Sequence, residues 1–208
     1  MRVLMPLKAC SVALLTLSSL SGCAAVSALG SASEVLDVYE LQAPRTLPEG
    51  PVRARDVVIE LPTTTGALQT DRIMIRPDPL QAQYLPGVRW GDATPVMVQT
   101  LMLRTLEASG RLGYVGRRPL GINGDYAVLT EIVDFQAEAV PEGPGAVVVL
   151  SLIGRVVRES DLRIMGTRRF AVQVPVASVS EAEVIAGFDQ AAQQLFAEHG
   201  AWVLSVVR

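Results

Sequence analysis

Residues 146–158 read AVVVLSLIGRVVR, the most β-rich run in the chain. A run of this length and composition predicts a strand. The segment before it, residues 142–145 (EGPG), is the strongest turn signal between two strands. Residues 162–174 follow across the short segment 159–161 (ESD) and are also strand-like. We therefore expect the two runs to pair as a hairpin.

Alternating apolar and polar residues predict further strands on the N-terminal side of this hairpin. The longest covers residues 126–140, in which Val128, Thr130 and Ile132 share one face. Residues 80–90 are expected to form an edge strand or the arm of a hairpin. Shorter strands are predicted over residues 37–41, 52–61, 71–76 and 112–117, with Pro77 closing the third of these.

The apolar period changes between residues 94 and 109, where it predicts a helix. Asp92 offers a capping side chain, and Pro95 suits the first helical turn. Gly110 is placed to be the left-handed residue that ends the helix. The apolar residues that recur at i, i+3 and i+4 spacing are Val98, Leu101, Met102, Thr105 and Leu106.

A second helix is predicted behind residues 180–183 (SEAE), which have the pattern of a capping box. An apolar stripe runs from Val184 to Leu195 and stays in register to Trp202. We therefore expect this helix to continue through Gly200 to about residue 205. The order of strands and helices predicts an α+β fold, a mostly antiparallel β-sheet with two α-helices packed on one face.

The N-terminal segment has the features of a secretory signal peptide. It begins with Arg2 and Lys8, continues with about a dozen apolar residues and ends in small residues. The apolar run is shorter than the roughly 20 residues that span a bilayer. Its end, residues 20–23 (LSGC), resembles a bacterial lipobox, in which the cysteine takes a diacylglycerol and becomes the first mature residue. The alternative is an ordinary signal peptide followed by a chance cysteine at Cys23.

The lipobox divides the chain into three predicted parts. They are a signal peptide over residues 1–22, the lipidated Cys23 with a flexible tether over residues 23–36, and a single domain over residues 37–208. Ala24 stands where many Gram-negative lipoproteins that stay at the inner membrane carry Asp. By analogy, this favours the periplasmic face of the outer membrane.

The composition argues against several classes of function. The formal net charge of −3 lacks the basic excess that a nucleic-acid partner requires. The sole histidine, His199, is expected to be a helix-end or surface residue, and no His or Cys cluster has metal-ligand spacing. The chain also lacks a P-loop and a Gly-x-Ser-x-Gly motif. We therefore expect no enzyme, no cofactor and no metal.

Carboxylates offer no obvious acid-base pair. Glu131 and Asp134 belong to one predicted strand, but at a spacing of three residues they should face opposite sides. A paired site would need a carboxylate from elsewhere in the chain.

Two segments are candidate interaction sites. Asp71 and Arg72 follow a Thr- and Gly-rich loop, although they are equally consistent with a turn and an exposed strand charge. Tyr84 and Trp90 flank a Pro-Gly pair, and large aromatic residues of this kind often anchor a partner. They can also cover the core, which the burial preference of such residues favours.

The chain resembles the ABC-type transport auxiliary lipoprotein family over nearly its whole mature length. The order and spacing of several segments carry the resemblance. They are residues 39–41 (YEL), 66–73 (GALQTDRI), 84–92 (YLPGVRWGD), 106–110 (LEASG), 125–126 (DY) with 134–135 (DF), 188–189 (FD) and Trp202.

This resemblance implies an outer-membrane-tethered adaptor of a lipid transport machine. The implied partners are a periplasmic mammalian-cell-entry-type lipid-binding protein and an ABC permease with its ATPase. Assembly of the chain into a homo-oligomer is a further alternative. The family supplies no catalytic residues. The matching positions at which docking or self-assembly is expected are Asp71, Arg72, Tyr84, Arg89 and Trp90.

Two other functions are compatible with the sequence. One is a lipid-binding periplasmic module, which would need an apolar cavity between the sheet and the helices. The other is a lipopolysaccharide-assembly-type lipoprotein. Pairing of an exposed strand edge with a partner segment is one docking mode that an adaptor of this architecture could use.

Overall fold

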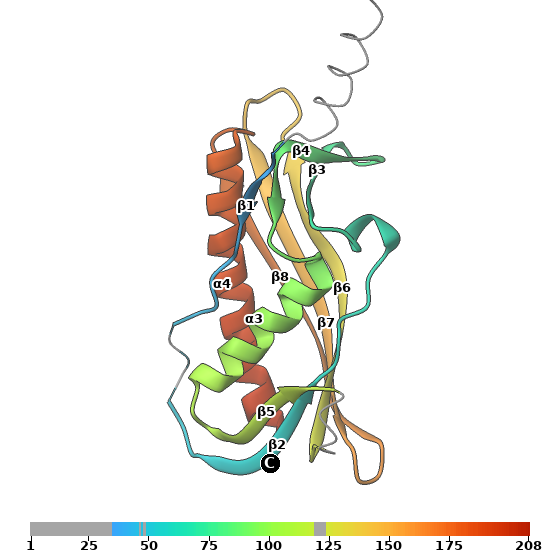
Figure 1. Cartoon of the computed structure of the whole chain (residues 1–208), viewed down its shortest axis with the longest axis vertical. Helices are drawn as coiled ribbons and strands as arrows, with labels where there is room; N and C mark the ends of the chain where they lie inside the picture. Colours follow the sequence, from blue (N-terminus) through green and yellow to red (C-terminus); the bar gives the residue numbers. More distant parts are fainter. Residues whose placement is uncertain (1–34, 46, 48, 119–123) are drawn as a thin grey trace, which may run out of the picture. The chain divides into compact units, whose positions relative to one another are not determined.

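The predicted hairpin forms the long strands at one side of the sheet (Figure 1). Strand β7 (Ala146–Arg158) pairs antiparallel with β8 (Arg163–Val176) along its whole length, with one register shift after Val156. Strand β6 (Tyr126–Ala139) pairs antiparallel with the other edge of β7. The predictions of these three strands and of the hairpin are confirmed.

The structure is a computed structural model that describes residues 35–45, 47, 49–118 and 124–208. Residues Asp37–Arg208 form one compact unit. The predicted signal peptide and Cys23 lie outside the described residues. Among the described residues, no helix is both long and apolar enough to cross a membrane.

Two parallel strands share the remaining edge of β6. Strand β2 (Arg53–Ile59) pairs with the start of β6, and β3 (Arg72–Asp78) pairs with its end. Between them, the Thr63 amide donates to the Thr130 carbonyl at 3.0 Å, which continues the pairing along β6. Pro77 does not close β3 as predicted, because a register shift against β4 (Gln81–Trp90) lets the strand run to Asp78.

Shorter pairings complete the eight-stranded sheet of the described residues. Strand β4 forms an antiparallel hairpin with β3, and β1 (Asp37–Tyr39) runs parallel to β4. Strand β5 (Leu112–Arg117) runs parallel to β2. The longest ladders are antiparallel, as predicted, but the parallel pairings at β1, β2, β3 and β5 make the sheet mixed.

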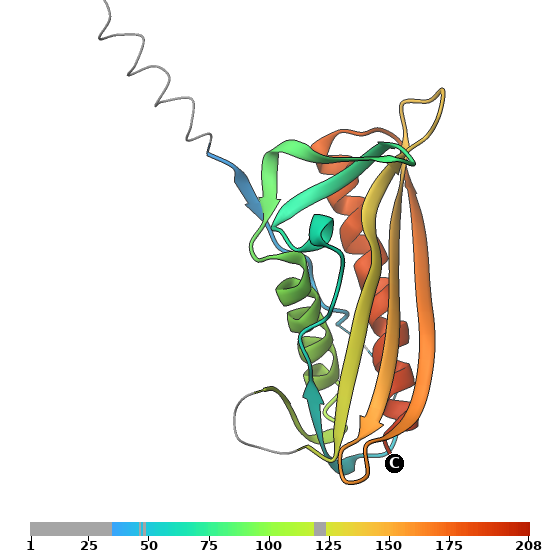
Figure 2. The same ribbon diagram turned by 90° about the vertical axis from the view of Figure 1, so that its right-hand side faces the viewer.

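Both helices lie on the same face of the sheet, which confirms the predicted α+β architecture (Figures 1 and 2). The helix α4 (Glu181–Val206) lies along β7 and β8 and continues through Gly200. The helix α3 (Thr94–Ala108) packs against α4, β2 and β5. Gly110 adopts the expected positive φ, at 59°.

The helix starts differ in detail from the prediction. Ala93, not Asp92, is the N-cap of α3, and it forms no side-chain capping bond. Ser180 is the N-cap of α4 as its position suggests, but the side-chain bonds of a capping box are absent. Its hydroxyl instead contacts the Ser178 hydroxyl at 2.9 Å. The helices are therefore held by packing more than by capping side chains.

Aromatic side chains connect α4 to the sheet. The ring of Phe188 lies 5.3 Å from Trp90 in an edge-on arrangement and 5.6 Å from Phe135 in a stacked one. Many buried side chains fill the core between the sheet and the helices. From the sheet these include Val57, Ile59, Val128, Ile132, Leu150, Leu152, Phe170 and Val172, and from the helices Val98, Leu101, Leu195, Phe196 and Val203.

The expectation that His199 is a surface or helix-end residue is wrong. Its side chain is buried between α4 and the sheet, with its ring centroid 5.3 Å from that of Phe170 and 6.0 Å from that of Trp202. Burial lowers the pKa of His199 to about 4, because the charged imidazolium would lose its hydration there. His199 is thus a neutral core residue at ordinary pH.

The expected separation of Glu131 and Asp134 is also wrong. A β-bulge between Ile132 and Asp134 inserts Val133 into the alternation, so that both carboxylates lie on the helix-free face. Each has a cationic neighbour from the same face. The two ion pairs are Arg155–Glu131 at 3.8 Å and Arg169–Asp134 at 3.7 Å.

Candidate functional site

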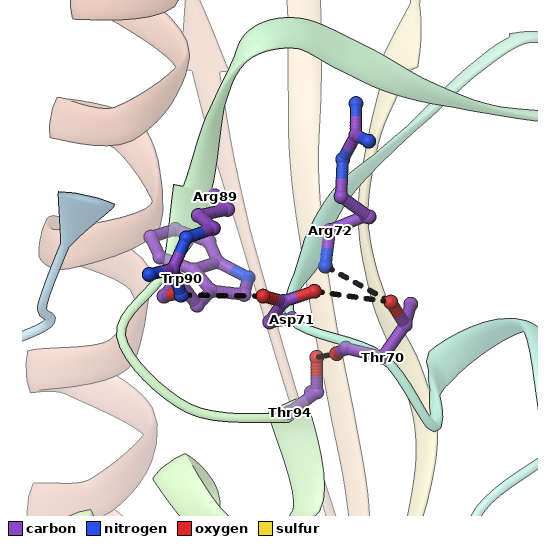
Figure 3. A network of polar contacts seen from close by, with 6 residues as sticks. All are labelled: Thr70, Asp71, Arg72, Arg89, Trp90 and Thr94. Atoms are coloured by element: carbon purple, nitrogen blue, oxygen red, sulfur yellow. Dashed lines mark hydrogen bonds and ion pairs between the residues drawn. The ribbon is translucent and has the colours of Figure 1, made fainter. Parts of the chain in front are cut away.

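The β3–β4 hairpin gathers the predicted interaction residues. Asp71 immediately precedes β3, and Arg72 is its first residue. Arg89 and Trp90 end β4, and Arg72 is the cross-strand partner of Arg89. Hairpin pairing therefore brings together charges that lie 17 or more residues apart in the chain (Figure 3).

An ion pair links the two strands at this point. The Arg89 Nη1 atom lies 3.2 Å from Asp71 Oδ2 and donates a second bond to the Trp90 carbonyl at 3.1 Å. The side chains of Arg89 and Asp71 are 35% and 38% exposed, so water screens this pair. The pair presents both charges at the surface in a fixed orientation.

Threonines connect the ion pair to the first turn of α3. The Thr70 hydroxyl donates to Asp71 Oδ1 at 3.4 Å and accepts the Arg72 amide at 3.3 Å. Thr94, the first residue of α3, donates its amide and its hydroxyl to the Thr70 carbonyl, at 2.9 and 3.1 Å. This network (Figure 3) fixes where the hairpin meets the helix.

Arg72 has a different environment from Arg89. Its side chain extends along the hairpin, away from Asp71 (Figure 3), and its Nη2 atom donates to the Leu85 carbonyl at 3.4 Å. Its Nε atom is buried without a hydrogen-bond partner among the described residues. Arg72 is therefore held against β4 and is less available at the surface than Arg89.

The two aromatic residues separate into one core and one surface position. Trp90 is 1% exposed, so its indole belongs to the core together with Phe188. Tyr84 is 38% exposed, and its hydroxyl donates to the Ala67 carbonyl at 3.0 Å. This bond holds the 3-10 turn η1 (Gly66–Leu68) beside β4 and leaves the tyrosine ring at the surface.

This arrangement is suited to contact with a macromolecule more than to chemistry. The Asp71 carboxylate is already paired with Arg89, so it is not positioned as a free base. Within the described ranges, no three His, Cys, Asp or Glu side chains gather in a way that could hold a metal ion. We use the name hairpin surface for the exposed parts of Asp71 and Arg89 together with Tyr84, which stands opposite Met74 further along the same hairpin.

Sequence reasoning missed a second feature, an apolar groove on the helix-free face. It has a volume of about 490 Å³, and the exposed side chains of Leu61, Leu129 and Leu162 contribute to its lining together with Val157. Arg118, at its rim, forms ion pairs with Glu60 and Glu159, so the charges beside the groove are mutually compensated. The apolar lining residues come from three separate segments, and only the sheet brings them together.

Comparison with protein families identifies the chain. A family model described as "ABC-type transport auxiliary lipoprotein component" matches residues 39–198. The chain belongs to this family. The match extends from the end of β1 into α4, so this auxiliary lipoprotein carries the hairpin surface within the family region. A comparison with curated proteins gives no sequence match.

Solved structures share the fold of this auxiliary lipoprotein. Protein XCC0632 from Xanthomonas campestris is 24% identical, with a TM-score of 0.74 over 82% of this chain and 95% of that one. An uncharacterized protein with a crystal structure is 10% identical, with a TM-score of 0.59 over 84% of this chain and 99% of that one. At these identities the similarity establishes the fold.

Proposed function

We propose that this auxiliary lipoprotein is a lipid-anchored adaptor at the periplasmic face of the outer membrane. In this role it docks a mammalian-cell-entry-type protein of an ABC-type lipid transport system. The family match over residues 39–198 is the observation that carries the proposal. The lipobox at residues 20–23 supports the anchor, and Ala24 supports sorting to the outer membrane.

The proposed anchor accounts for stable attachment to a membrane. Each buried methylene group contributes about 0.8 kcal/mol, and a single acyl chain binds only marginally. Two or three chains on Cys23 would make release very slow. The tether over residues 23–36 then lets the folded domain contact a partner while the protein stays at the membrane.

The hairpin surface is the proposed docking site, which we assign to the partner or to self-assembly. Asp71 and Arg89 offer one charge of each sign in a fixed orientation, and Tyr84 adds an exposed aromatic ring. Rim charges of this type contribute to specificity and association rate, and aromatic residues contribute to affinity. The protein acts by binding in this proposal, without catalysis or a cofactor.

Cross-linking in intact membranes tests the adaptor role. The full-length protein is cross-linked in its own cells, purified in detergent and analysed by mass spectrometry. We expect the mammalian-cell-entry-type protein or the permease among the products. The double variant Tyr84→Ala, Arg89→Glu should reduce its recovery, whereas Glu107→Ala, an exposed position on α3, should not. Products that contain no component of such a transporter would contradict the proposal.

The apolar groove favours a second candidate function, direct lipid binding. Its volume of about 490 Å³ lies within the range of small-molecule sites, roughly 300–1,000 Å³. Its place on the helix-free face differs from the expected cavity between the sheet and the helices. Native mass spectrometry of the purified protein should then detect a bound lipid that is lost in Leu129→Asp. Ligand-free wild-type protein would contradict this second function.

A further inference from the structure

Strand β8 leaves a long edge without a strand partner. Its residues, apart from Met165 at the register shift, pair with β7 on one side, and no strand pairs with its other side within the part of the chain that the structure describes. Figure 2 shows β8 (orange) at the margin of the sheet, with α4 behind it. The outward-facing amide and carbonyl groups of this margin, except at Pro175, which has no amide hydrogen, are therefore available for pairing with another chain.

The edge is held rigid from the inside. Phe170, Val172 and Val174 point towards α4 and are buried, so β8 is fixed in an extended conformation before any partner arrives. Preorganisation lowers the entropic cost of adding a strand. Proteins normally cover or disrupt edges of this length, because an open edge favours aggregation.

The charge of β8 indicates what could cover this edge. Residues 162–180 contain Arg163, Arg168 and Arg169 and no acidic residue, and all three arginines are exposed. Arg168 forms no ion pair with a described residue, and its guanidinium carbon lies 4.9 Å from the centre of the Phe170 ring. Arg169 lies on the opposite face of the strand, so both faces of β8 carry positive charge.

The nearest acidic side chain in sequence is already engaged. Asp161 accepts hydrogen bonds from Arg158 at 3.0 and 2.7 Å, and this interaction lowers its pKa to about 2. Asp161 therefore compensates Arg158, which stands directly across from Arg163 in the ladder. Arg169 is paired with Asp134 at 3.7 Å, so the charges of β8 that form no ion pair with a described residue are those of Arg163 and Arg168.

We infer that an extended acidic segment of a partner protein adds to β8 as a further strand. Backbone hydrogen bonds would supply the pairing, and carboxylates beside Arg163 and Arg168 would supply the selectivity. A second copy of the chain is disfavoured, because pairing β8 with itself would bring six arginines onto two adjacent strands. The inference rests on the proposed adaptor role, and it adds a site and the chemistry of the segment that binds there.

Site-specific photo-cross-linking in the full-length protein tests this inference. A photo-reactive amino acid is placed at Thr167 or at Gln173, both exposed on β8, and a control is placed at Glu107 on α3. After irradiation in the native membrane, the cross-linked peptide is sequenced. We expect both β8 positions, but not the control, to capture the same acidic segment of one partner. The two sites should cross-link to residues along it in an order consistent with an extended strand.

Charge variants complete the test. The double variant Arg163→Glu, Arg168→Glu should reduce the yield of this product about tenfold, as expected for reversing two rim charges. The matched variant Arg104→Glu, on the exposed side of α3, should leave it unchanged. Products that join two copies of this chain, a captured segment that is neutral or basic, or no product from either β8 position would each overturn the inference. If the transporter component cross-links only through the hairpin surface, the adaptor role stands and the β8 site does not.

Discussion

His199 is the residue whose environment differs most from what its sequence position suggests. Its Nε2 atom has no hydrogen-bond partner among the described residues, and Gly154 on β7 leaves the space that its ring occupies. A buried imidazole without a partner is stable only in its neutral form. The cost of protonating it makes His199 a probe of how firmly α4 packs on the sheet.

This environment predicts a pH-dependent stability. The pKa of His199 is about 4 in the folded state, against 6.5 for an ordinary histidine, so the unfolded chain binds a proton first as the pH falls. The contribution of neutral His199 to the free energy of unfolding is complete above pH 6.5. It decreases between pH 6.5 and 4, by up to about 3 kcal/mol. Urea unfolding across this range should show the loss. The His199→Phe variant should show a smaller slope, and an identical slope would contradict the prediction.

The adjacent residues Arg89 and Trp90 of β4 should contribute very different amounts to stability. Replacing Trp90 with Ala removes a buried ring that packs on Phe188, so we expect a loss of about 3–5 kcal/mol in the free energy of unfolding. Replacing Arg89 with Ala removes only a half-exposed ion pair, so the loss should be under about 1 kcal/mol. Denaturant midpoints measure both. Equal losses would mean that the ion pair is part of the core.

At the level of elements, the contact between α4 and the hairpin depends on small residues in the strands. A Cβ atom at Gly154 would lie 3.1 Å from the Trp202 ring, and one at Gly166 would lie 3.3 Å from it. These two positions on neighbouring strands let the C-terminal half of α4 approach the sheet closely.

Enlarging one of these glycines should therefore separate α4 from the sheet. We expect Gly154→Val to lower the free energy of unfolding by about 1–3 kcal/mol through overpacking against Trp202. The matched variant Arg155→Val, on the other face of the same strand, should change it by no more than about 0.5 kcal/mol apart from the weak pair with Glu131. Thermal unfolding of the two variants provides the measurement, and an undisturbed Gly154→Val protein would contradict this packing.

Local periodicity was sufficient to predict most elements but not their pairing. The helix expected over residues 94–109 is α3 (Thr94–Ala108), and the one expected to reach about residue 205 is α4, which ends at Val206. The parallel pairing of β2 and β3 with one edge of β6 depends on contacts far apart in sequence, which no local pattern encodes. The bulge at Val133 has no signal of its own, because valine is an ordinary strand residue.

At the scale of the whole folded domain, one face of the sheet carries the helices and the other carries the apolar groove, while β8 provides a long margin. The sequence placed the candidate residues Asp71 and Arg89 in separate segments, and their ion pair depends on the hairpin that joins β3 and β4. Trp90 is buried because Phe188, from a segment about 100 residues later, packs against its ring. The groove and the charge of β8 required the sheet order, which the sequence pattern did not supply.

The central claim is that this domain works while acyl chains on Cys23 hold it at a membrane. Metabolic labelling with an alkyne fatty acid tests it most directly, with Cys23→Ser as the matched control. We predict that the mature wild-type protein carries the label and sediments with membranes, whereas the Cys23→Ser protein is unlabelled and remains in the supernatant. An unlabelled wild-type protein, or a Cys23→Ser protein that still sediments with membranes, would contradict the account.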